Sequence, residues 1–329
     1  MASLPPFQEL LHSANVEDLK NWIEEQVNTQ DENELTALHK ASRDGDIAKV
    51  KYLIQIGAQI DVKNGDGWTP LHFSVGNGHL ETVQCLIDNG AQIEAKMTDD
   101  GWTPLYFAVN KENVEIVKLL VEKGANLETK QKKGWTPLHS AVAKGFLKVV
   151  KLLVKKGAYL EAKTGNGWNP LHLAVGKGFL EIVKLLVENG ANLEAKDQTA
   201  GCAPLHLAVI KGPLKIVKIL IDKGANIDAT NVNNETPFYL AYKTNSKEIS
   251  KYLLEKKREC PEENISNKAP CIICSEPRYA LYVLNPCGHT SLCEICLFKI
   301  FEQNHAKCPT CRKPAQNYIK LFFQAPEEM

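Results

Sequence analysis

The residues of this chain whose types and spacing point most clearly to a chemical role are eight candidate metal ligands near its C-terminus. They form four pairs in chain order, which are Cys271 and Cys274, Cys287 and His289, Cys293 and Cys296, and Cys308 and Cys311. Zinc prefers four nitrogen and sulfur ligands in a tetrahedron, and a two-residue gap lets both thiolates of one turn face the same ion. Seven cysteines and one histidine within 41 residues therefore predict two complete zinc shells.

A set of disulfides explains the same residues poorly. Seven is an odd number of cysteines, a disulfide framework gives the histidine no role, and the N-terminus lacks the charged-then-apolar pattern of a secretion signal. Because both shells are filled by protein ligands, we expect the two Zn²⁺ ions to be structural and unable to activate a nucleophile themselves. About sixty residues bury too little apolar surface to fold alone, so zinc binding and folding of this segment are expected to be one event.

The ligand order, with Pro286-Cys287-Gly288-His289 at its centre, resembles that of RING fingers. The resemblance covers roughly the last sixty residues and implies a cross-braced arrangement in which alternate pairs share a metal. The first ion would be held by Cys271, Cys274, Cys293 and Cys296, and the second by Cys287, His289, Cys308 and Cys311.

The same resemblance implies a surface for a ubiquitin-conjugating enzyme (E2). Ile273, Ile300 and Pro309 match positions that contact the E2 in active RING ligases. Arg312 directly follows the last ligand, where those ligases carry a cation that bridges the E2 and its attached ubiquitin. The implied mechanism is positional, because the thioester is held ready for attack and the ligase forms no covalent bond. The alternatives are ordinary packing for the apolar residues and a surface charge for Arg312.

The tail from Arg312 to Phe323 resembles the ending of inhibitor-of-apoptosis and Mdm-type ligases. In those proteins the RING dimerises through a C-terminal strand, and a near-terminal aromatic residue touches ubiquitin on the other subunit. Phe322 falls at about that offset, although this chain continues to Met329. Simple packing of the strand onto the RING is the alternative.

Length and composition place bounds on the rest of the chain. A chain of 329 residues has room for about two domains. Its 39 basic and 39 acidic residues balance, so nothing global favours a nucleic-acid or membrane partner. No apolar stretch approaches the roughly twenty residues that span a bilayer. Only Cys85, Cys202 and Cys260 lie outside the ligand set, which suits a reducing compartment, so we expect a cytoplasmic protein with access to the nucleus open.

The residues before the ligands repeat with a period of 33 to 34. A phrase such as Thr69-Pro-Leu-His72 recurs seven times, starting at residues 36, 69, 103, 136, 169, 203 and 236. Its first residue caps a short helix, and Pro fits the first turn because that position needs no amide hydrogen. A second phrase, such as Leu180 to Leu186, predicts a helix with one buried face. Each such helix should end near a residue with a left-handed backbone conformation. Glycine occupies that position at Gly57, Gly90, Gly124, Gly157, Gly190 and Gly224.

This pattern resembles ankyrin repeats. The resemblance implies a mainly α-helical solenoid of about eight units, with an atypical first unit at residues 5–31, followed by the small RING domain. We expect an ankyrin-repeat domain at 1–258, a polar linker at 259–270, the RING at 271–312 and a tail at 313–329. The repeats depart mildly from their pattern at Ala37, Glu112, Cys202 and Ala203.

Two columns of residues recur in the repeats and are candidates for substrate binding. Trp68, Trp102, Trp135 and Trp168 stand immediately before the capping phrase, and Lys111, Lys144, Lys177 and Lys211 stand eight residues after each capping position. One interpretation is an aromatic and basic groove for an acidic or extended peptide. The other is tryptophans that stack on their neighbours beside a solvated stripe of lysines. His72, His139, His172 and His206 are expected to make capping hydrogen bonds and not to bind metal.

The two resemblances together predict a RING-type E3 ubiquitin ligase. The repeats would select a protein substrate, and the RING would recruit E2-bound ubiquitin and promote its transfer to lysine. The alternative is a non-catalytic ankyrin scaffold whose RING only dimerises or binds protein. The expected partners are an E2, ubiquitin, a protein substrate and a second copy of the RING, with no nucleic acid and no membrane.

Overall fold

The computed structural model describes residues 25–98, 100–259, 281–285 and 317–321. The chain divides into two compact units, Met1–Ser250 and Lys251–Met329. Each unit is described here by itself. The predicted atypical first unit at residues 5–31 lies largely outside the described residues, which begin at Glu25 with a short helical segment that buries Val27.

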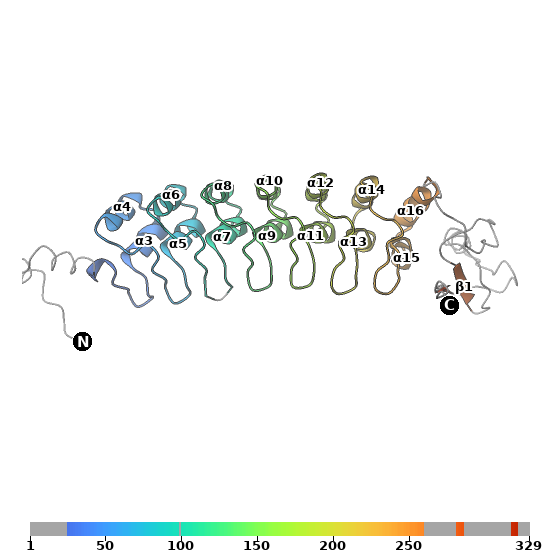
Figure 1. The fold of residues 1–329 in the computed structure, drawn as a ribbon, viewed down its shortest axis with the longest axis horizontal. Coiled ribbons are helices and arrows are strands. Elements are labelled where there is room, and N and C mark those ends of the chain that lie inside the picture. The colour runs from blue at the N-terminus through green and yellow to red at the C-terminus, as the bar shows by residue number, and fades with distance from the viewer. Residues whose placement is uncertain (1–24, 99, 260–280, 286–316, 322–329) are drawn as a thin grey trace, which may run out of the picture. The chain divides into compact units, whose positions relative to one another are not determined.

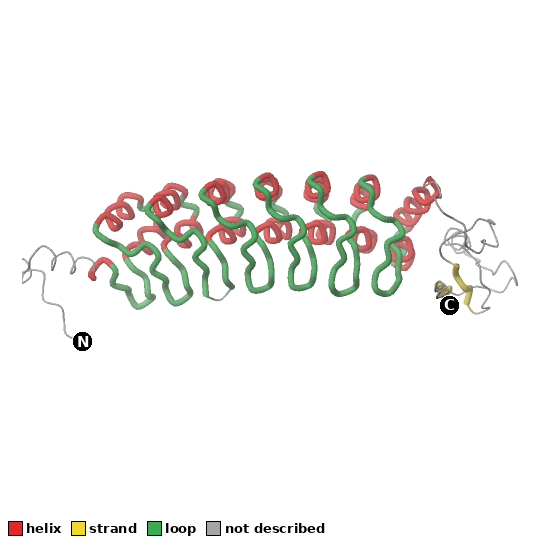
Figure 2. Tube along the Cα trace, viewed as in Figure 1, coloured by secondary structure: helices red, strands yellow, loops and turns green. Residues whose placement is uncertain are grey.

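In the first unit, two rows of short helices lie side by side, with all the hairpin loops projecting on one side (Figures 1 and 2). The inner helices, next to the hairpins, are α3 (Ala37–Asp44), α5 (Pro70–Asn77), α7 (Pro104–Asn110), α9 (Pro137–Lys144), α11 (Pro170–Lys177), α13 (Pro204–Lys211) and α15 (Pro237–Lys243). The outer helices are α4 (Ile47–Gln55), α6 (Leu80–Asp88), α8 (Val114–Glu122), α10 (Leu147–Lys155), α12 (Leu180–Glu188), α14 (Leu214–Asp222) and α16 (Lys247–Glu259). The last of these crosses the boundary between the compact units.

One hairpin, one inner helix and one outer helix make a repeat, and the repeats are numbered here by the residue that caps the inner helix. Repeats 2 to 8 are capped by Thr36, Thr69, Thr103, Thr136, Asn169, Ala203 and Thr236. The predicted solenoid of helix pairs is therefore confirmed over the described residues.

The inner helices begin as the capping phrase predicts. In repeat 3, the Thr69 side chain accepts a hydrogen bond from the amide of His72, and Pro70 occupies the first turn. The same cap occurs at the other Thr and Asn positions. Ala203 is the exception, because its methyl group cannot accept, and α13 begins without a side-chain cap.

The outer helices from α4 to α14 each end two residues before one of the six predicted glycines, whose φ angles of 85° to 94° lie in the left-handed region. That conformation is costly for residues with a Cβ atom. The turn between inner and outer helices also uses glycine in repeats 2, 3, 5 and 6, but repeat 4 places Glu112 there with a φ of 58°. This substitution in the pattern carries backbone strain.

Apolar side chains from both helix rows fill the space between repeats. In repeat 3, Leu71 and Val75 of the inner helix and Val83 and Leu86 of the outer helix are all completely buried. Equivalent residues are buried in the following repeats, so each interface closes the same kind of core.

Polar bonds tie consecutive repeats together along the hairpins. The Glu94 carboxylate accepts from the amide of Asn126 at 2.8 Å, and Glu161 accepts from Asn192 at 2.8 Å. At the turns, the Lys132 amide donates to the Asp100 carbonyl at 3.1 Å. Because such bonds join each repeat to the next, the hairpins form a continuous ladder.

The hairpin before repeat 7 is one residue longer than most of the others, because capping positions 169 and 203 are 34 residues apart. One side chain accommodates the extra residue. The buried Asp197 carboxylate accepts from the amides of Thr199, Ala200 and Gly201 at 2.7 to 3.0 Å. Burial raises the pKa of Asp197, but the hydrogen bonds from Ala200 and Thr199 outweigh it and hold the pKa below its usual range.

The described part of the second unit contains a two-stranded sheet. Strand β1 (Leu281–Asn285) pairs antiparallel with β2 (Asn317–Leu321), with Leu281 opposite Leu321 and Asn285 opposite Asn317. None of the helices in the described part of the chain combines the length and apolar character needed to cross a bilayer.

Candidate functional site

All the residues predicted to carry RING chemistry lie outside the described residues. They are the eight zinc ligands Cys271, Cys274, Cys287, His289, Cys293, Cys296, Cys308 and Cys311, together with Arg312, Ile273, Ile300, Pro309 and Phe322. Their donor chemistry, seven thiolates and one imidazole, fits two tetrahedral Zn²⁺ sites without an open position.

The strand pair connects two parts of the segment that holds the ligands. Asn285 precedes Cys287 by two residues, and its partner Asn317 follows Cys311 by six. The resemblance assigns Cys287 and Cys311 to the same zinc ion. The strand pairing therefore brings together two chain segments that lie close in sequence to these two ligands. It also places tail residues 317–321 in a strand that pairs within this chain, as simple strand packing of the tail would require.

The histidines of the capping phrase have the structural role that the sequence predicts. In repeat 3, the Thr69 amide donates to His72 Nδ1 at 3.3 Å, so Nε2 carries the proton and donates to the Trp102 carbonyl of the next repeat at 3.3 Å. His39, His139, His172 and His206 make equivalent bonds. Among the described residues, no group of three or more His, Cys, Asp or Glu side chains could hold a metal ion.

Burial keeps these imidazoles neutral. Desolvation lowers the pKa of His72 and of His139 to about 4, and it also lowers the pKa of His39, His172 and His206. Each histidine therefore serves as an uncharged bridge between repeats.

The four tryptophans each follow a hairpin turn, but their surroundings differ. Trp68 and Trp102 belong to an aromatic cluster. The ring centroid of Trp68 lies 5.0 Å from that of Phe73 and 5.0 Å from that of Phe107, while Trp102 lies 5.6 Å from Phe107 and 5.1 Å from Tyr106. These two indoles therefore pack against neighbouring aromatic side chains.

Trp135 and Trp168 have fewer aromatic neighbours. Within the described residues, the rings paired with them belong to His139 and His172 of their own repeats, at 6.4 Å each. Trp168 also covers Gly176 of α11, where an added Cβ atom would lie 3.4 Å from the indole. All four indoles are half-buried, so what sets Trp135 and Trp168 apart is the smaller number of aromatic rings packed against them.

The four candidate lysines lie at the C-terminal ends of inner helices and are exposed. Positive charge is favourable there because of the helix dipole. Lys144 Nζ donates to the Asn110 carbonyl at 2.9 Å, and Lys111 Nζ lies 5.8 Å from the centre of the Phe107 ring. In the described part of the chain, none of the four forms an ion pair with an acidic side chain.

The Lys111 contact joins the two columns, because Phe107 also touches Trp68 and Trp102. The hairpin turns and the exposed side of the inner helices thus form one surface, called the inner surface here. The two predicted columns meet on it, since Phe107 contacts Lys111, Trp68 and Trp102.

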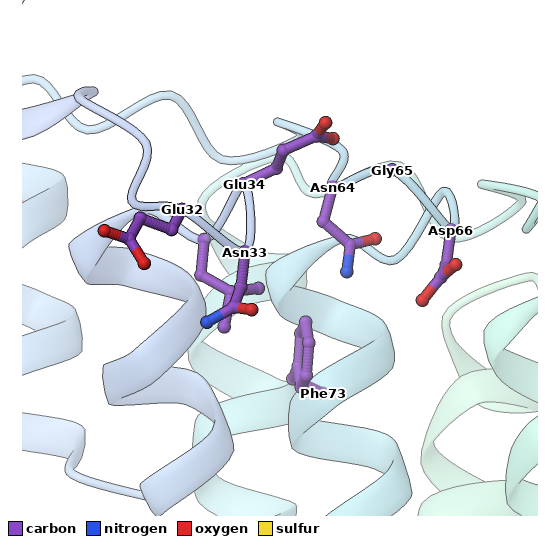
Figure 3. A pocket seen from close by; sticks show the side chains of 8 residues that line it. Glu32, Asn33, Glu34, Asn64, Gly65, Asp66 and Phe73 are labelled. Carbon is purple, nitrogen blue, oxygen red and sulfur yellow. The ribbon is translucent and has the colours of Figure 1, made fainter.

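Sequence reasoning missed a pocket of about 340 Å³ on the inner surface at repeats 2 and 3. Figure 3 shows Phe73 rising from α5 between Asn33 and Asn64, with Glu32 to one side and Asp66 to the other. The signal in the sequence is weak, since Phe73 occupies a position that holds Lys40, Phe107, Ser140 or Leu173 in other repeats.

Comparison with known proteins supports both halves of this description. A family model for ankyrin repeats matches residues 8–97, 93–164 and 159–231, which together exceed half of the chain. The ankyrin repeat domain of Bcl-3, a member of the IkappaB family, superposes with a TM-score of 0.63 at 30% identity over 68% of this chain and 100% of that domain. The human ASB11 ankyrin repeat domain gives 0.57 at 26% identity over 70% of this chain and 100% of that domain.

A model for the C3HC4 zinc finger, or RING finger, matches residues 267–318. Three curated proteins are similar over short stretches. They are mouse RNA-binding protein MEX3D (40% identical over 52 residues), mouse E3 ubiquitin-protein ligase NEURL1B (34% over 62) and Apoptosis inhibitor 1 of Autographa californica nuclear polyhedrosis virus (38% over 60). These matches cover 16%, 19% and 18% of this chain but span only 8%, 11% and 19% of the relatives.

The RING match includes all eight ligands, so the zinc-binding character predicted from their spacing agrees with the family. The ankyrin match covers most of the repeats that the structure describes. The chain belongs to the ankyrin-repeat family and carries a C-terminal RING finger of the C3HC4 type.

Proposed function

We propose that this protein is a RING-type E3 ubiquitin ligase whose repeats bind the substrate. The observation that carries the proposal is the complete C3HC4 ligand set followed directly by Arg312. A module that only dimerised or bound protein would need the ligands, but it would not need a cation at that position.

The two zinc ions would be held by the eight ligands and would supply structure, not chemistry. Ile273, Ile300 and Pro309 would bind the E2 through apolar contact. Arg312 would donate hydrogen bonds to carbonyl groups of the E2 and of ubiquitin together, because its planar guanidinium presents several donors in a fixed geometry. Catalysis then consists of holding the thioester where a substrate lysine can attack it.

Discharge assays on the full-length, zinc-loaded protein separate binding from catalysis. Arg312→Ala should slow transfer of ubiquitin from the E2 to free lysine while leaving E2 affinity nearly unchanged. Ile273→Ala should weaken E2 binding itself. If both variants discharge ubiquitin as fast as an active wild type, the scaffold interpretation is the better one.

The tail raises a separate proposal, that the RING acts as a dimer with Phe322 reaching ubiquitin on the other subunit. Mixing Arg312→Ala protein with Phe322→Ala protein tests it, because one half of each mixed dimer would combine an intact Arg312 with an intact Phe322. Activity should then partly return. Heterodimers that remain as inactive as either parent would exclude the contact across subunits.

The inner surface is the part of the repeats that we propose for substrate capture, with the tryptophan column as its anchors. The hydrogen bond from each capping histidine to the next repeat ends at a backbone carbonyl of the residue before the capping position and does not involve that residue's side chain. His172 makes the same bond to the carbonyl of Cys202, which is not a tryptophan, at 3.1 Å. The indole side chains of Trp135 and Trp168 are therefore not needed for this bridge. Trp is enriched among residues that dominate binding energy, and exposed Lys111, Lys144, Lys177 and Lys211 lie alongside.

The packing differences predict unequal effects of substitution. Trp135→Ala combined with Trp168→Ala should weaken substrate binding by on the order of 2 kcal/mol or more if these indoles are anchors. Trp68→Ala serves as the matched control, because it removes a cluster residue and should mainly lower stability. Normal substrate binding by the folded double variant would reduce the column to a structural role.

A further inference from the structure

Charge on the hairpin turns changes sign along the inner surface. The turns of repeats 2, 3 and 4 carry exposed acidic residues, which are Glu32, Glu34, Asp66 and Asp100. The turn of repeat 5 carries Lys132 and Lys133, both exposed. The zero net charge of the whole chain conceals this reversal, which occurs between two neighbouring hairpins.

The basic part continues onto the inner helices beyond the reversal. Lys144, Lys177 and Lys211 end the inner helices of repeats 5, 6 and 7, beside the half-buried Trp135 and Trp168. Residues 130–163 contain nine lysines and only one acidic residue, Glu161, although four of these lysines belong to the outer helix α10 and its end. Repeats 5 to 7 thus combine basic side chains with two half-buried indoles that lie outside the aromatic cluster.

The acidic part contains a pocket. The pocket at repeats 2 and 3 holds Glu32 and Asp66 at its sides and half-buried Phe73 within it (Figure 3). An aromatic ring with carboxylates beside it suits a Lys or Arg side chain, since the cation can lie over the ring while the carboxylates accept its hydrogen bonds.

The distance between the two parts sets the length of a ligand that could reach both. Neighbouring helices pack about 8–10 Å apart, so the Phe73 pocket lies roughly 25–30 Å from the Trp135 and Trp168 pair, three repeats away. An extended chain rises about 3.3 Å per residue, so eight or nine residues span that distance.

We propose that the inner surface binds an extended peptide segment of a partner protein in one orientation, with a basic residue in the Phe73 pocket and an acidic, apolar end at repeats 5 to 7. Opposite charges at the two ends favour this placement, and the reversed placement brings like charges together at both ends. The proposal rests on the proposed substrate-binding role of the repeats and names the kind of substrate segment they would recognise.

The probe is a labelled synthetic peptide with two arginines, eight neutral residues that include leucines, and two glutamates, measured by fluorescence anisotropy on the full-length zinc-loaded protein. We expect it to bind at least ten-fold more tightly than a peptide of the same composition with its charges intermixed. A peptide with a four-residue spacer should also bind more weakly, because it cannot reach both parts.

Charge reversal in the protein provides the matched variants. Glu32→Lys with Asp66→Lys, or Lys132→Glu with Lys133→Glu, should each weaken the bipolar peptide several-fold. The protein that carries all four changes should recover part of the affinity, because the peptide can then turn round. A photo-crosslinker on the glutamate end should attach to repeats 5 to 7 in the wild type and move toward repeats 2 and 3 in the four-fold variant.

Several results would overturn the inference. One is equal affinity for the bipolar and intermixed peptides. Another is an all-acidic peptide that binds as tightly as the bipolar one, which would show that only the lysines contribute to peptide binding. Circular dichroism on each variant separates lost binding from lost folding. Self-ubiquitination by the same preparations separates the two proposals, because it reports the ligase activity without needing the peptide.

Discussion

The Ser42 hydroxyl is a buried polar group that finds no hydrogen-bond partner among the described residues. Ser42 lies in α3, and the equivalent residues in repeats 3 to 7 are the buried Val75, Val109, Val142, Val175 and Val209. An unpaired buried hydroxyl costs about 1–3 kcal/mol of stability. This residue therefore weakens the N-terminal end of the array.

We expect Ser42→Val to raise the free energy of unfolding by about 1–3 kcal/mol, because it removes the unpaired hydroxyl and adds apolar contact. Urea denaturation measures the change. Ser74→Ala is the matched control, because the Ser74 hydroxyl already donates to the Leu71 carbonyl at 2.9 Å. If both substitutions shift the midpoint equally, hydroxyl satisfaction is not the cause.

The missing cap at Ala203 gives a second prediction at this scale. Ala203→Thr should stabilise the protein by about 1 kcal/mol, since the new hydroxyl can accept from the His206 amide as Thr136 does from His139. Thr136→Ala should cost a similar amount. Thermal melts of both variants measure the changes. If Ala203→Thr leaves the melting temperature unchanged, α13 gains no stability from a side-chain cap.

At the scale of elements, the two compact units have different sources of stability. The helices of the repeats are held by apolar burial and by bonds between neighbours. The strand pair belongs to a segment in which eight ligands must hold zinc before a small core can form. Removal of metal should therefore affect one unit selectively.

We expect metal analysis of the full-length protein to return two zincs per chain, and chelation to abolish E2 binding while leaving most of the helical circular dichroism signal intact. One zinc, or none, in a preparation that still binds E2 would contradict the cross-braced arrangement. A large loss of helical signal on chelation would show that the repeats depend on the metal.

Elements whose signals are local could be predicted from the sequence. A cap, a proline in the first turn and a glycine at the helix end each act within a few residues, so the helices appear where the phrases predict them. The histidine bridge was predicted only as a cap. Its second bond, to the next repeat, depends on stacking that one repeat does not encode.

The candidate binding surface was harder to predict from the sequence, because it too depends on contacts between neighbouring repeats. The tryptophan column looks uniform in the sequence, but Trp68 packs against Phe107 of the next repeat while Trp135 has no counterpart of that ring. The Phe73 pocket likewise combines two hairpins and one helix. Contacts between repeats, and not the residue types themselves, separate the indoles in the aromatic cluster from those outside it.

At the scale of the whole repeat array, five buried histidines link stability to pH. Their pKa values are lower in the folded protein than the usual value of 6.5, so the neutral form is favoured by folding. Above pH 6.5 both states are neutral and the stabilisation is fully present. As pH falls, the unfolded chain takes up protons first, and stability declines until the folded pKa, about 4 for His72 and His139, is reached.

Stability measured by urea unfolding should therefore fall between pH 6.5 and 4.5, by up to about 1.4 kcal/mol per pH unit for each histidine involved. His139→Gln removes one titrating group while keeping a side chain that can serve in a capping box. Its deficit relative to the wild type should shrink as pH falls. A constant deficit would show that His139 does not contribute to the pH dependence.

The bonds between hairpins have a mechanical consequence. Each repeat is joined to its neighbours and to nothing more distant in the described array, so a force applied along the chain loads one interface at a time. Stretching should release repeats in steps of 33 to 34 residues, each adding roughly 110 Å of contour length. An optical trap would resolve those steps, and a single rupture of the whole array would show that the interfaces fail together. Stepwise yielding would let the terminal repeats open under load while the central ones stay folded.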